Sequence, residues 1–234
     1  MTDRTPLILV PGLLCDSLLW ANQIGALGDL ADCQVANPVN HDSIKGMASD
    51  VLHRTPFPRF ALAGLSMGGY VALEIMRQAP DRVLKLALLD TSARPDTREQ
   101  TERRQALIRM AQNGKFELVV QTLIPALLGR ARSEDPPIVG AVRTMARNVG
   151  IDAFYRQEAA IIGRIDSRPF LPSIQCATLL VCGRQDAITP VELHQELAGG
   201  IKGSILKIID DCGHLSTMER PEHVSACLRE WLTN

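Results

Sequence analysis

Short runs of apolar residues recur along the chain between longer stretches in which apolar and polar positions mix. Six of these runs are rich in Leu, Ile, Val and Ala, and polar positions do not alternate within them. Such continuous runs are typical of strands buried on both faces, which occur in parallel sheets between two layers of helices. We therefore predict an α/β fold with a mostly parallel sheet of about six strands flanked by helices. The predicted strands span residues 7–10, 33–37, 60–64, 84–90, 177–183 and 204–210.

Helical spacing of the apolar positions fills most of the intervals between these runs. Residues 66–79 form one predicted helix, which ends where Pro80 cannot continue it. Another begins at Pro221, and its apolar positions recur every three to four residues. This spacing is typical of helices that pack on a sheet, so we expect helices to cover both of its faces.

One interval, residues 91–168, contains helical patterns only. Within it, Thr97 and Gln100 have the spacing of a capping box, which predicts the start of a helix. The interval of about 78 residues is much longer than a simple crossover between parallel strands requires. We therefore predict a four-helix cap inserted before the last two strands. The chain then divides into an α/β core domain, residues 1–90 and 169–234, and a helical cap, residues 91–168.

Composition and charge narrow the class of protein. The chain has 46% hydrophobic and 22% charged residues, as an ordinary globular domain does. Its formal net charge of −1 favours neither nucleic acid nor an anionic membrane as a partner. No apolar run reaches the roughly 20 residues that span a bilayer. The six cysteines form no C-x-x-C pair, and no basic leader precedes the first apolar run, so we expect a cytoplasmic protein with reduced thiols.

A serine stands among three glycines where the third apolar run passes into a helix. Residues 64–68, Gly-Leu-Ser-Met-Gly, fit the pattern G-x-S-x-G between a strand and a helix. Such a turn holds the serine in a strained conformation above the sheet edge, and the glycines provide the clearance that it needs. The N-terminus of the following helix directs free N–H groups at any negative charge that develops there. Ser66 is therefore the candidate nucleophile.

A serine hydroxyl needs a base before it can act as a nucleophile. His214 follows the last predicted strand, where Gly213 permits a tight turn toward the carboxyl edge of the sheet. Asp186 follows the preceding strand and is the candidate carboxylate that orients the histidine. Serine, acid and histidine in this chain order match one known arrangement of a catalytic triad.

These segments together resemble the α/β-hydrolase fold superfamily over the whole chain. GLSMGG resembles its nucleophile elbow, GRQDAITP its acid turn, and CGHLSTMERPEHV its histidine loop and final helix. Helical caps inserted after the strand that ends near Asp90 also match the family. The resemblance implies that Ser66 is the nucleophile, Asp186 the orienting acid and His214 the general base.

The resemblance extends to an oxyanion loop. VPGLLCDSLLW resembles the loop after the first core strand of the family, although Pro11 stands where a histidine is usual. The contact that matters in this loop is a backbone N–H, so the change of side chain leaves the function possible. The resemblance implies an oxyanion hole made by the N–H groups of Leu13 and Met67, with Leu14 open as the alternative to Leu13.

Other polar residues near the same sheet edge compete for roles in the site. Asp90 also ends a predicted strand, but we favour Asp186 because the turn after the later strand is the usual acid site of the family. His41 follows the second strand and is either a substrate contact or a solvated loop histidine. Asp210 and Asp211 lack spaced His or Cys ligands, which favours a solvated turn over a metal site.

We predict a serine hydrolase that cleaves a small or medium carboxylic ester, a small-molecule substrate, and requires no metal or organic cofactor. We leave open four other activities that would use the same residues: a lactonase, a thioesterase, a carbon–carbon bond hydrolase and a perhydrolase. The oligomeric state is also left open. Residues 91–168 carry 13 basic and 9 acidic side chains, which leaves open an anionic substrate. Two alternatives of other classes are a hydrolase-like ligand-binding protein and an interaction protein that docks through the cap.

Overall fold

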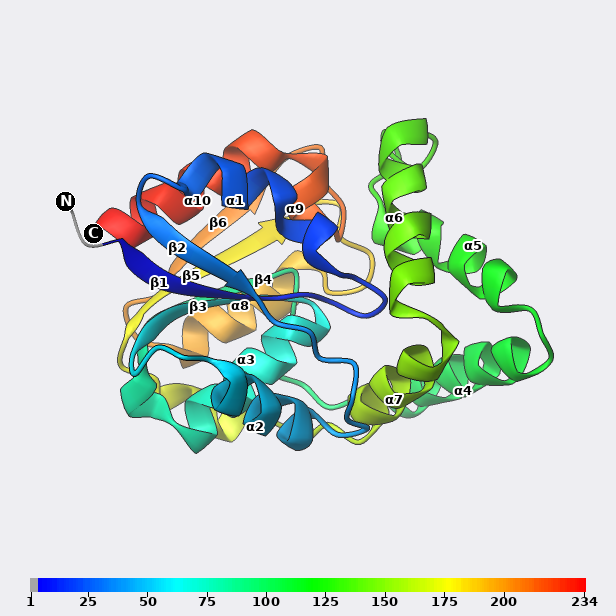
Figure 1. The fold of residues 1–234 in the computed structure, drawn as a ribbon, viewed down its shortest axis with the longest axis horizontal. Coiled ribbons are helices and arrows are strands. Elements are labelled where there is room, and N and C mark those ends of the chain that lie inside the picture. The colour runs from blue at the N-terminus through cyan, green and yellow to red at the C-terminus, as the bar shows by residue number, and fades with distance from the viewer. Residues whose placement is uncertain (1–3) are drawn as a thin grey trace.

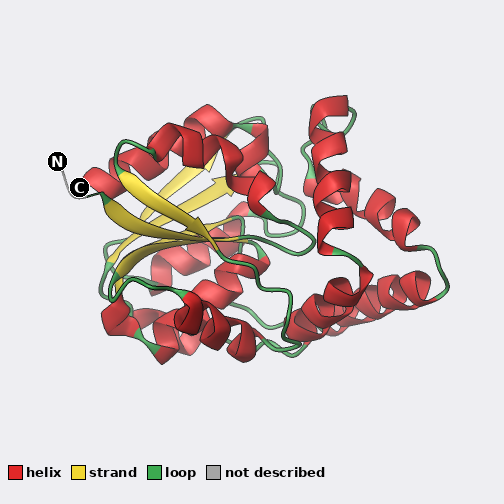
Figure 2. Cartoon of the chain, viewed as in Figure 1, coloured by secondary structure: helices red, strands yellow, loops and turns green. Residues whose placement is uncertain are grey.

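The structure is a computed structural model that describes residues 4–234, and within these residues it forms three layers (Figures 1 and 2). The strands are β1 (Thr5–Val10), β2 (Ala31–Val35), β3 (Phe60–Leu65), β4 (Val83–Leu89), β5 (Ala177–Gly183) and β6 (Ile205–Ile209). They form one sheet in the order β2-β1-β3-β4-β5-β6, and every neighbouring pair is parallel. The prediction of a parallel six-stranded sheet flanked by helices is therefore confirmed.

Two groups of helices cover the two faces of the sheet. These helices are α1 (Ala21–Leu27), α2 (Ile44–Arg54), α3 (Met67–Gln78), α8 (Val191–Gly200), α9 (Ser216–Glu219) and α10 (Pro221–Thr233). Figure 1 shows α1, α9 and α10 on one face, and α2, α3 and α8 on the other. Three short 3₁₀ helices, η1 (Ser17–Trp20), η2 (Pro80–Arg82) and η3 (Arg168–Ser173), lie in the connections. Within residues 4–234, each helix is too short or too polar to cross a bilayer.

The sheet contributes side chains to an apolar core on each of its faces. Along β1, Leu7 and Leu9 join the cluster on the side of α1 and α10. Ile8 and Val10, which alternate with them, join the cluster on the side of α2 and α3. Successive side chains of a strand point to opposite faces. Both faces of this sheet are covered, which explains why its strands are continuous apolar runs.

Four further helices separate β4 from β5 in the chain. They are α4 (Arg98–Gln112), α5 (Phe116–Leu127), α6 (Pro136–Val149) and α7 (Ile151–Ile162), which we call the α4–α7 segment. They lie to one side of the sheet, and the strand arrows point toward them (Figure 1). The predicted capping box of Thr97 and Gln100 is confirmed at the start of α4. The division into a core domain and a cap with the bounds 91–168 stays a prediction.

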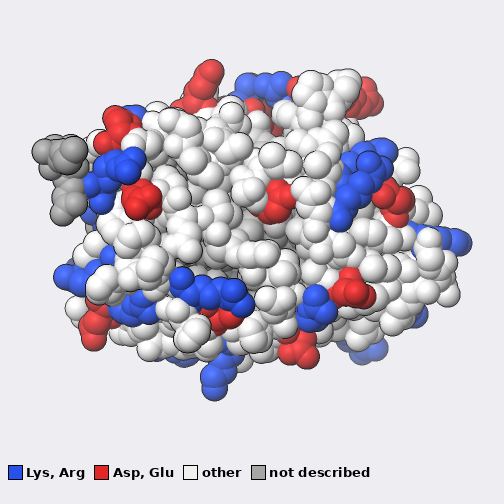
Figure 3. All heavy atoms as spheres, in the orientation of Figure 1, with Lys and Arg blue, Asp and Glu red and all other residues white. Residues whose placement is uncertain are grey.

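Charged side chains of both signs are interspersed over the face shown in Figure 3. Among the surface ion pairs of the molecule, Arg229 lies 2.8 Å from Asp29 and Lys207 lies 3.1 Å from Glu230. Exposed pairs of this kind add little to stability, because water screens their attraction and holding two long side chains in one geometry costs entropy. The stability of the fold therefore rests mainly on the two apolar clusters.

Leu62, in the middle of β3, tests this conclusion because its side chain is fully buried. Leu62→Ala removes a well-packed side chain and leaves a cavity, so it should lower the free energy of unfolding by about 2–5 kcal/mol in urea titrations. The matched control is Leu118→Ala on α5, where the leucine is 45% exposed and the expected change stays within about 0.5 kcal/mol. Equal losses for the two variants would contradict this account of the core.

Candidate active site

The turn from β3 into α3 places Ser66 at the carboxyl edge of the sheet. Ser66 has φ 56° and ψ −117°, a conformation that L-residues rarely adopt. Its N–H donates to the carbonyl of Leu89 at 3.0 Å, at the end of the neighbouring strand β4. Its carbonyl accepts from the Thr91 hydroxyl at 2.8 Å and from the Gly69 N–H at 2.8 Å. These bonds hold the strained backbone in place.

Two glycines of the turn are required because backbone segments approach them closely. A Cβ added to Gly64 would lie 2.2 Å from the carbonyl oxygen of Gly68. A Cβ added to Gly68 would lie 2.1 Å from the carbonyl oxygen of Val10, at the end of β1. Only glycine permits both approaches. Gly64 and Gly68, which the sequence predicted to provide clearance, are therefore the residues that allow α3 to start directly behind Ser66.

Ser66, His214 and Asp186 lie in one chain of hydrogen bonds. His214 Nε2 is 2.8 Å from Ser66 Oγ, and His214 Nδ1 is 2.8 Å from Asp186 Oδ2. His214 is 1% exposed and lies in the loop between β6 and α9, whereas Asp186 follows β5. When Nδ1–H donates to the carboxylate, Nε2 is left to accept from the serine hydroxyl. The structure therefore brings together the three residues that the sequence singled out.

The Asp186 carboxylate is fixed by donors from its own loop. The N–H groups of Ile188 and Thr189 donate to Oδ1 at 2.8 and 2.9 Å. The Thr189 hydroxyl donates to Oδ2 at 2.7 Å, beside the bond from His214. A carboxylate that accepts this many hydrogen bonds keeps its ionised form and one orientation. It can therefore hold the imidazole of His214 in a single position.

Electrostatics favours opposite charges on His214 and Asp186. Burial alone would lower the pKa of His214, but the carboxylates around it, Asp186 first and then Asp90 and Glu219, together outweigh burial and raise that pKa above its ordinary value. Burial alone would raise the pKa of Asp186, but His214 and the hydrogen bonds to the carboxylate lower it on balance. The pair therefore stabilises an imidazolium next to Ser66, as a proton acceptor there would need.

Asp90 is also buried at this edge, but its partners differ from those of Asp186. Its Oδ1 accepts from the Gly183 N–H at 3.0 Å, and its Oδ2 accepts from the N–H and the hydroxyl of Ser216. Burial and the nearby Asp186 raise the pKa of Asp90 to about 8. Asp90 thus joins the end of β5 to the start of α9, while Asp186 bonds to His214.

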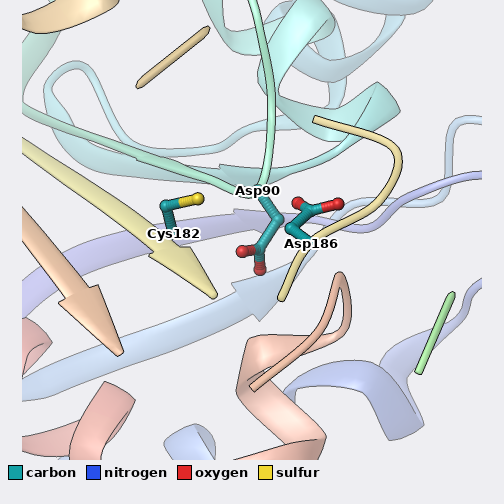
Figure 4. A group of neighbouring side chains, drawn as sticks. All are labelled: Asp90, Cys182 and Asp186. Atoms are coloured by element: carbon teal, nitrogen blue, oxygen red, sulfur yellow. The ribbon is translucent and has the colours of Figure 1, made fainter. Parts of the chain in front are cut away.

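Asp90, Asp186 and Cys182 bring their potential metal ligand atoms within 4.8 Å of one another (Figure 4). The carboxylate oxygens, however, already accept N–H and O–H donors. Burial raises the pKa of the Cys182 thiol, which keeps it protonated and a poor ligand. The donors around the group are therefore arranged for hydrogen bonding to carboxylates, and the group does not fit a cation.

The loop after β1 lies against Ser66 and presents backbone N–H groups. A Cβ added to Gly12 would lie 3.3 Å from Cβ of Ser66. The N–H of Leu14 donates to Gln157 Oε1 at 3.0 Å and is therefore occupied. Within residues 4–234, the N–H groups of Leu13 and Met67 have no hydrogen-bond acceptor. This pattern of partners favours Leu13 over Leu14 as the donor that is free to bind an oxyanion.

Gln157 was not singled out from the sequence, although a signal for it was present. It lies on α7 between Phe154 and Ile161, at spacings that place all three on one buried face. A polar residue on a buried helix face needs partners, and Gln157 finds them in Leu14 and in the carbonyl of Pro38. The residue fastens the loop after β1 to the α4–α7 segment.

Glu219 fastens the histidine loop in the same way, and the sequence did not single it out either. Its carboxylate accepts from the N–H groups of Gly129 at 2.8 Å, Gly213 at 3.1 Å and Leu215 at 3.2 Å. The N–H of His214 also donates to the carbonyl of Leu127, the last residue of α5, at 3.2 Å. The position of His214 therefore depends on contacts with the α4–α7 segment as well as with the sheet.

A cavity of about 190 Å³ opens over these residues. Ser66 and His214 line it together with the loop of residues 12–15, and helices α4–α7 supply most of the remaining wall. His41 does not line this cavity, and its Nε2 lies 3.9 Å from Asp50 on α2. The apolar lining residues include Leu107, Val120, Leu123, Leu127, Val142, Ala146, Ile161, Ile188 and Leu215.

Comparison with known proteins identifies the family of the chain. The family model described as the alpha/beta hydrolase fold matches residues 5–221. The chain belongs to the α/β-hydrolase fold family. The resemblance to this family that the sequence motifs indicated is thereby confirmed.

Relatives of this α/β hydrolase include proteins named for ester and lactone chemistry. A pimeloyl-[acyl-carrier protein] methyl ester esterase from Neisseria meningitidis is 27% identical over 73% of this chain and 68% of its own length. The 3-oxoadipate enol-lactonase 2 of Acinetobacter baylyi is 25% identical over 94% and 85%. The structure of a thermophilic esterase from Thermogutta terrifontis with malate bound superposes with a TM-score of 0.89 at 31% identity, covering 98% of this chain and 89% of that one.

Because burial and the neighbouring carboxylates shift the pKa of His214 in opposite directions, removing a carboxylate should change that pKa. Replacing Asp186 with Asn removes the carboxylate that opposes burial most strongly, so the pKa of His214 should fall below its value in the unmodified protein. NMR titration of the histidine ring resonances measures this pKa directly. Asp210→Asn, which removes an exposed carboxylate before the same loop, is the control and should leave the pKa unchanged. A His214 pKa that is equal in Asp186→Asn and the parent would show that Asp186 does not set the charge of the imidazole.

Proposed function

We propose that this chain hydrolyses a small or medium carboxylic ester through an acyl-enzyme formed on Ser66. Its family, and relatives that are esterases and an enol-lactonase, support the coarser conclusion that it is an ester hydrolase of the α/β-hydrolase fold. The observation that carries the finer proposal is the chain of two 2.8 Å hydrogen bonds from Ser66 through His214 to Asp186, at the wall of an apolar cavity.

The first half of the proposed reaction acylates the enzyme. Ser66 Oγ attacks the ester carbonyl carbon as its proton passes to His214 Nε2. Asp186 stabilises the imidazolium, and the N–H groups of Leu13 and Met67 donate to the tetrahedral oxyanion. The intermediate then expels the alcohol, which takes the proton from His214. The products of this half are the free alcohol and an ester between the acyl group and Ser66.

The second half releases the acid and restores the enzyme. Water in the place of the alcohol gives a proton to His214 and attacks the acyl carbonyl carbon. The second tetrahedral intermediate expels Ser66 Oγ, which recovers its proton from His214. The balance of the reaction is ester plus water to acid plus alcohol, with no redox change and no requirement for a metal or organic cofactor.

The cavity supports a substrate of limited size. Its volume of about 190 Å³ lies below the range of roughly 300–1,000 Å³ typical of sites for drug-sized ligands. Leucine and valine side chains of α5 and α6 line it and favour an apolar portion in the substrate. The enol-lactonase among the relatives is named for a small lactone, 3-oxoadipate enol-lactone, which supports a small-molecule substrate.

A lactone is the second candidate substrate, and the enol-lactonase relative is the observation that favours it. Ring opening of a lactone uses the same attack by Ser66 and the same oxyanion. The difference is that the alcohol stays covalently joined to the acyl group and leaves only with it. A pocket that admits a compact ring would therefore hydrolyse lactones with the same residues.

Hydrolysis of p-nitrophenyl esters from acetate to decanoate tests the proposed function. The rate should peak at one chain length, which measures the acyl pocket. Ser66→Ala removes the nucleophile and should lower kcat/KM by about 10³-fold or more at that length.

The matched control is Ser49→Ala, which deletes an exposed hydroxyl on α2 and should keep the full rate. Equal rates for Ser66→Ala and the parent protein at every chain length would overturn the proposal. An absence of any rate above the blank would favour a binding protein or another bond type.

A further inference from the structure

One face of α4 departs from the apolar lining of the cavity. Gln100, Arg103, Arg104 and Leu107 all line it, and their spacing of i, i+3, i+4 and i+7 places them on one helix face. A helix face turned toward an interior space is normally apolar. Here three of the four positions are polar, and two of them are arginines. The part of the wall that comes from α5 and α6 includes Val120, Leu123, Leu127, Val142 and Ala146.

Arg104 is held rigidly by two buried carboxylates. Its side chain is 18% exposed, its Nε donates to Asp96 at 2.8 Å, and its Nη1 donates to Glu158 at 2.9 Å. Burial alone would lower the pKa of Arg104, but the two carboxylates raise it, so the guanidinium stays charged. Within residues 4–234, its Nη2 donates to no protein acceptor. The planar guanidinium of Arg104 is thus held in one orientation, and its Nη2 group is the donor left for a ligand.

The charges around Arg104 balance without Arg103. Arg164 also pairs with Asp96, so two arginines face Asp96 and Glu158. Arg103 lines the same cavity and is exposed, and it has no carboxylate partner within 4 Å among the described residues. Burial raises the pKa of Glu158 on balance, and Arg103 lies close enough to that carboxyl to oppose part of the rise. This wall therefore presents one uncompensated positive charge to whatever enters the cavity.

We propose that the substrate carries a second, ionised carboxylate, which Arg103 and the free Nη2 of Arg104 bind while the ester lies at Ser66. The substrate class is then the monoester of a dicarboxylic acid, or a lactone that bears a carboxylate. The apolar wall of α5 and α6 packs against the carbon chain between the two groups. A planar guanidinium matches a carboxylate in shape and charge, and such hydrogen bonds are the strong ones. This inference rests on the proposed ester hydrolysis.

Matched esters of the diacids from succinate to suberate test the inference. At each length, the monomethyl ester is anionic and the dimethyl ester is neutral. The ratio of their kcat/KM values should favour the monomethyl ester by about tenfold or more at the preferred length. Arg103→Gln should lower this ratio several-fold. Arg104 is left intact because its loss would leave Asp96 and Glu158 buried without this partner.

Arg109→Gln is the matched control, since it removes the same charge from an exposed position of α4 that does not line the cavity. It should keep the ratio of the parent protein. A parent ratio of one or less at every length, or equal changes in the Arg103 and Arg109 variants, would overturn the inference.

Calorimetric binding to Ser66→Ala separates this inference from the proposed function. Monomethyl adipate should bind this variant more tightly than dimethyl adipate by about tenfold, and the added change Arg103→Gln should remove most of the difference. Such a preference without turnover in the parent protein would uphold the carboxylate site and reject ester hydrolysis. Turnover of neutral esters with no binding preference would uphold hydrolysis and reject the carboxylate site.

Discussion

The close approach of β1, β3 and α3 around Gly64 and Gly68 is the constraint on which the rest of the site depends. With no side chains there, the carbonyl of Val10 and the turn of α3 occupy the space that a Cβ would need. This packing holds Ser66 at a positive φ and brings the loop at Gly12 against it. Ser66, the loop of residues 12–15 and the N-terminus of α3 therefore share one rigid corner. Strain at one residue is tolerated because the bonds around it fix its conformation.

Two buried carboxylates at the same sheet edge behave differently because their partners differ. Asp186 contacts the imidazole of His214 and several donors of its own loop, which on balance lower its pKa. Among the described residues Asp90 forms no ion pair, and burial together with Asp186 outweighs the effect of His214 and raises the pKa of Asp90 to about 8. The ionised carboxylate is thus placed where an imidazolium would form, and the other one ties β5 to α9. One edge can hold both because only one of them must be charged.

Much of this arrangement was predictable from local sequence. Continuous apolar runs identified all six strands, and β5 spans the predicted residues 177–183. Gly64 and Gly68 pointed to the elbow through the local pattern G-x-S-x-G. The clearance that Gly64 provides is local, since it faces Gly68, whereas Gly68 faces the carbonyl of Val10 on β1. Parallel strands end at a common edge, so residues just after β5 and β6 were expected near Ser66.

The contacts of the α4–α7 segment were not predictable in the same way. Gln157 bonds to Leu14 across 143 positions of the chain, and Glu219 bonds to Gly129 across 90. Which face of a helix meets the core depends on how the helices dock, and that is a property of the whole fold. Arg103 and Arg104 appeared in the sequence only as part of a basic segment. Their place in the cavity follows from the docking of α4.

Labelling with a fluorophosphonate tests the central claim most directly, because the reagent reacts with a serine only when a neighbouring base activates it. Intact mass and peptide mapping would be measured over time for the parent protein, Ser66→Ala and His214→Ala. The account predicts one adduct on Ser66 in the parent, none at that position in Ser66→Ala, and much slower labelling in His214→Ala. An unlabelled Ser66, or labelling in His214→Ala as fast as in the parent, would contradict it.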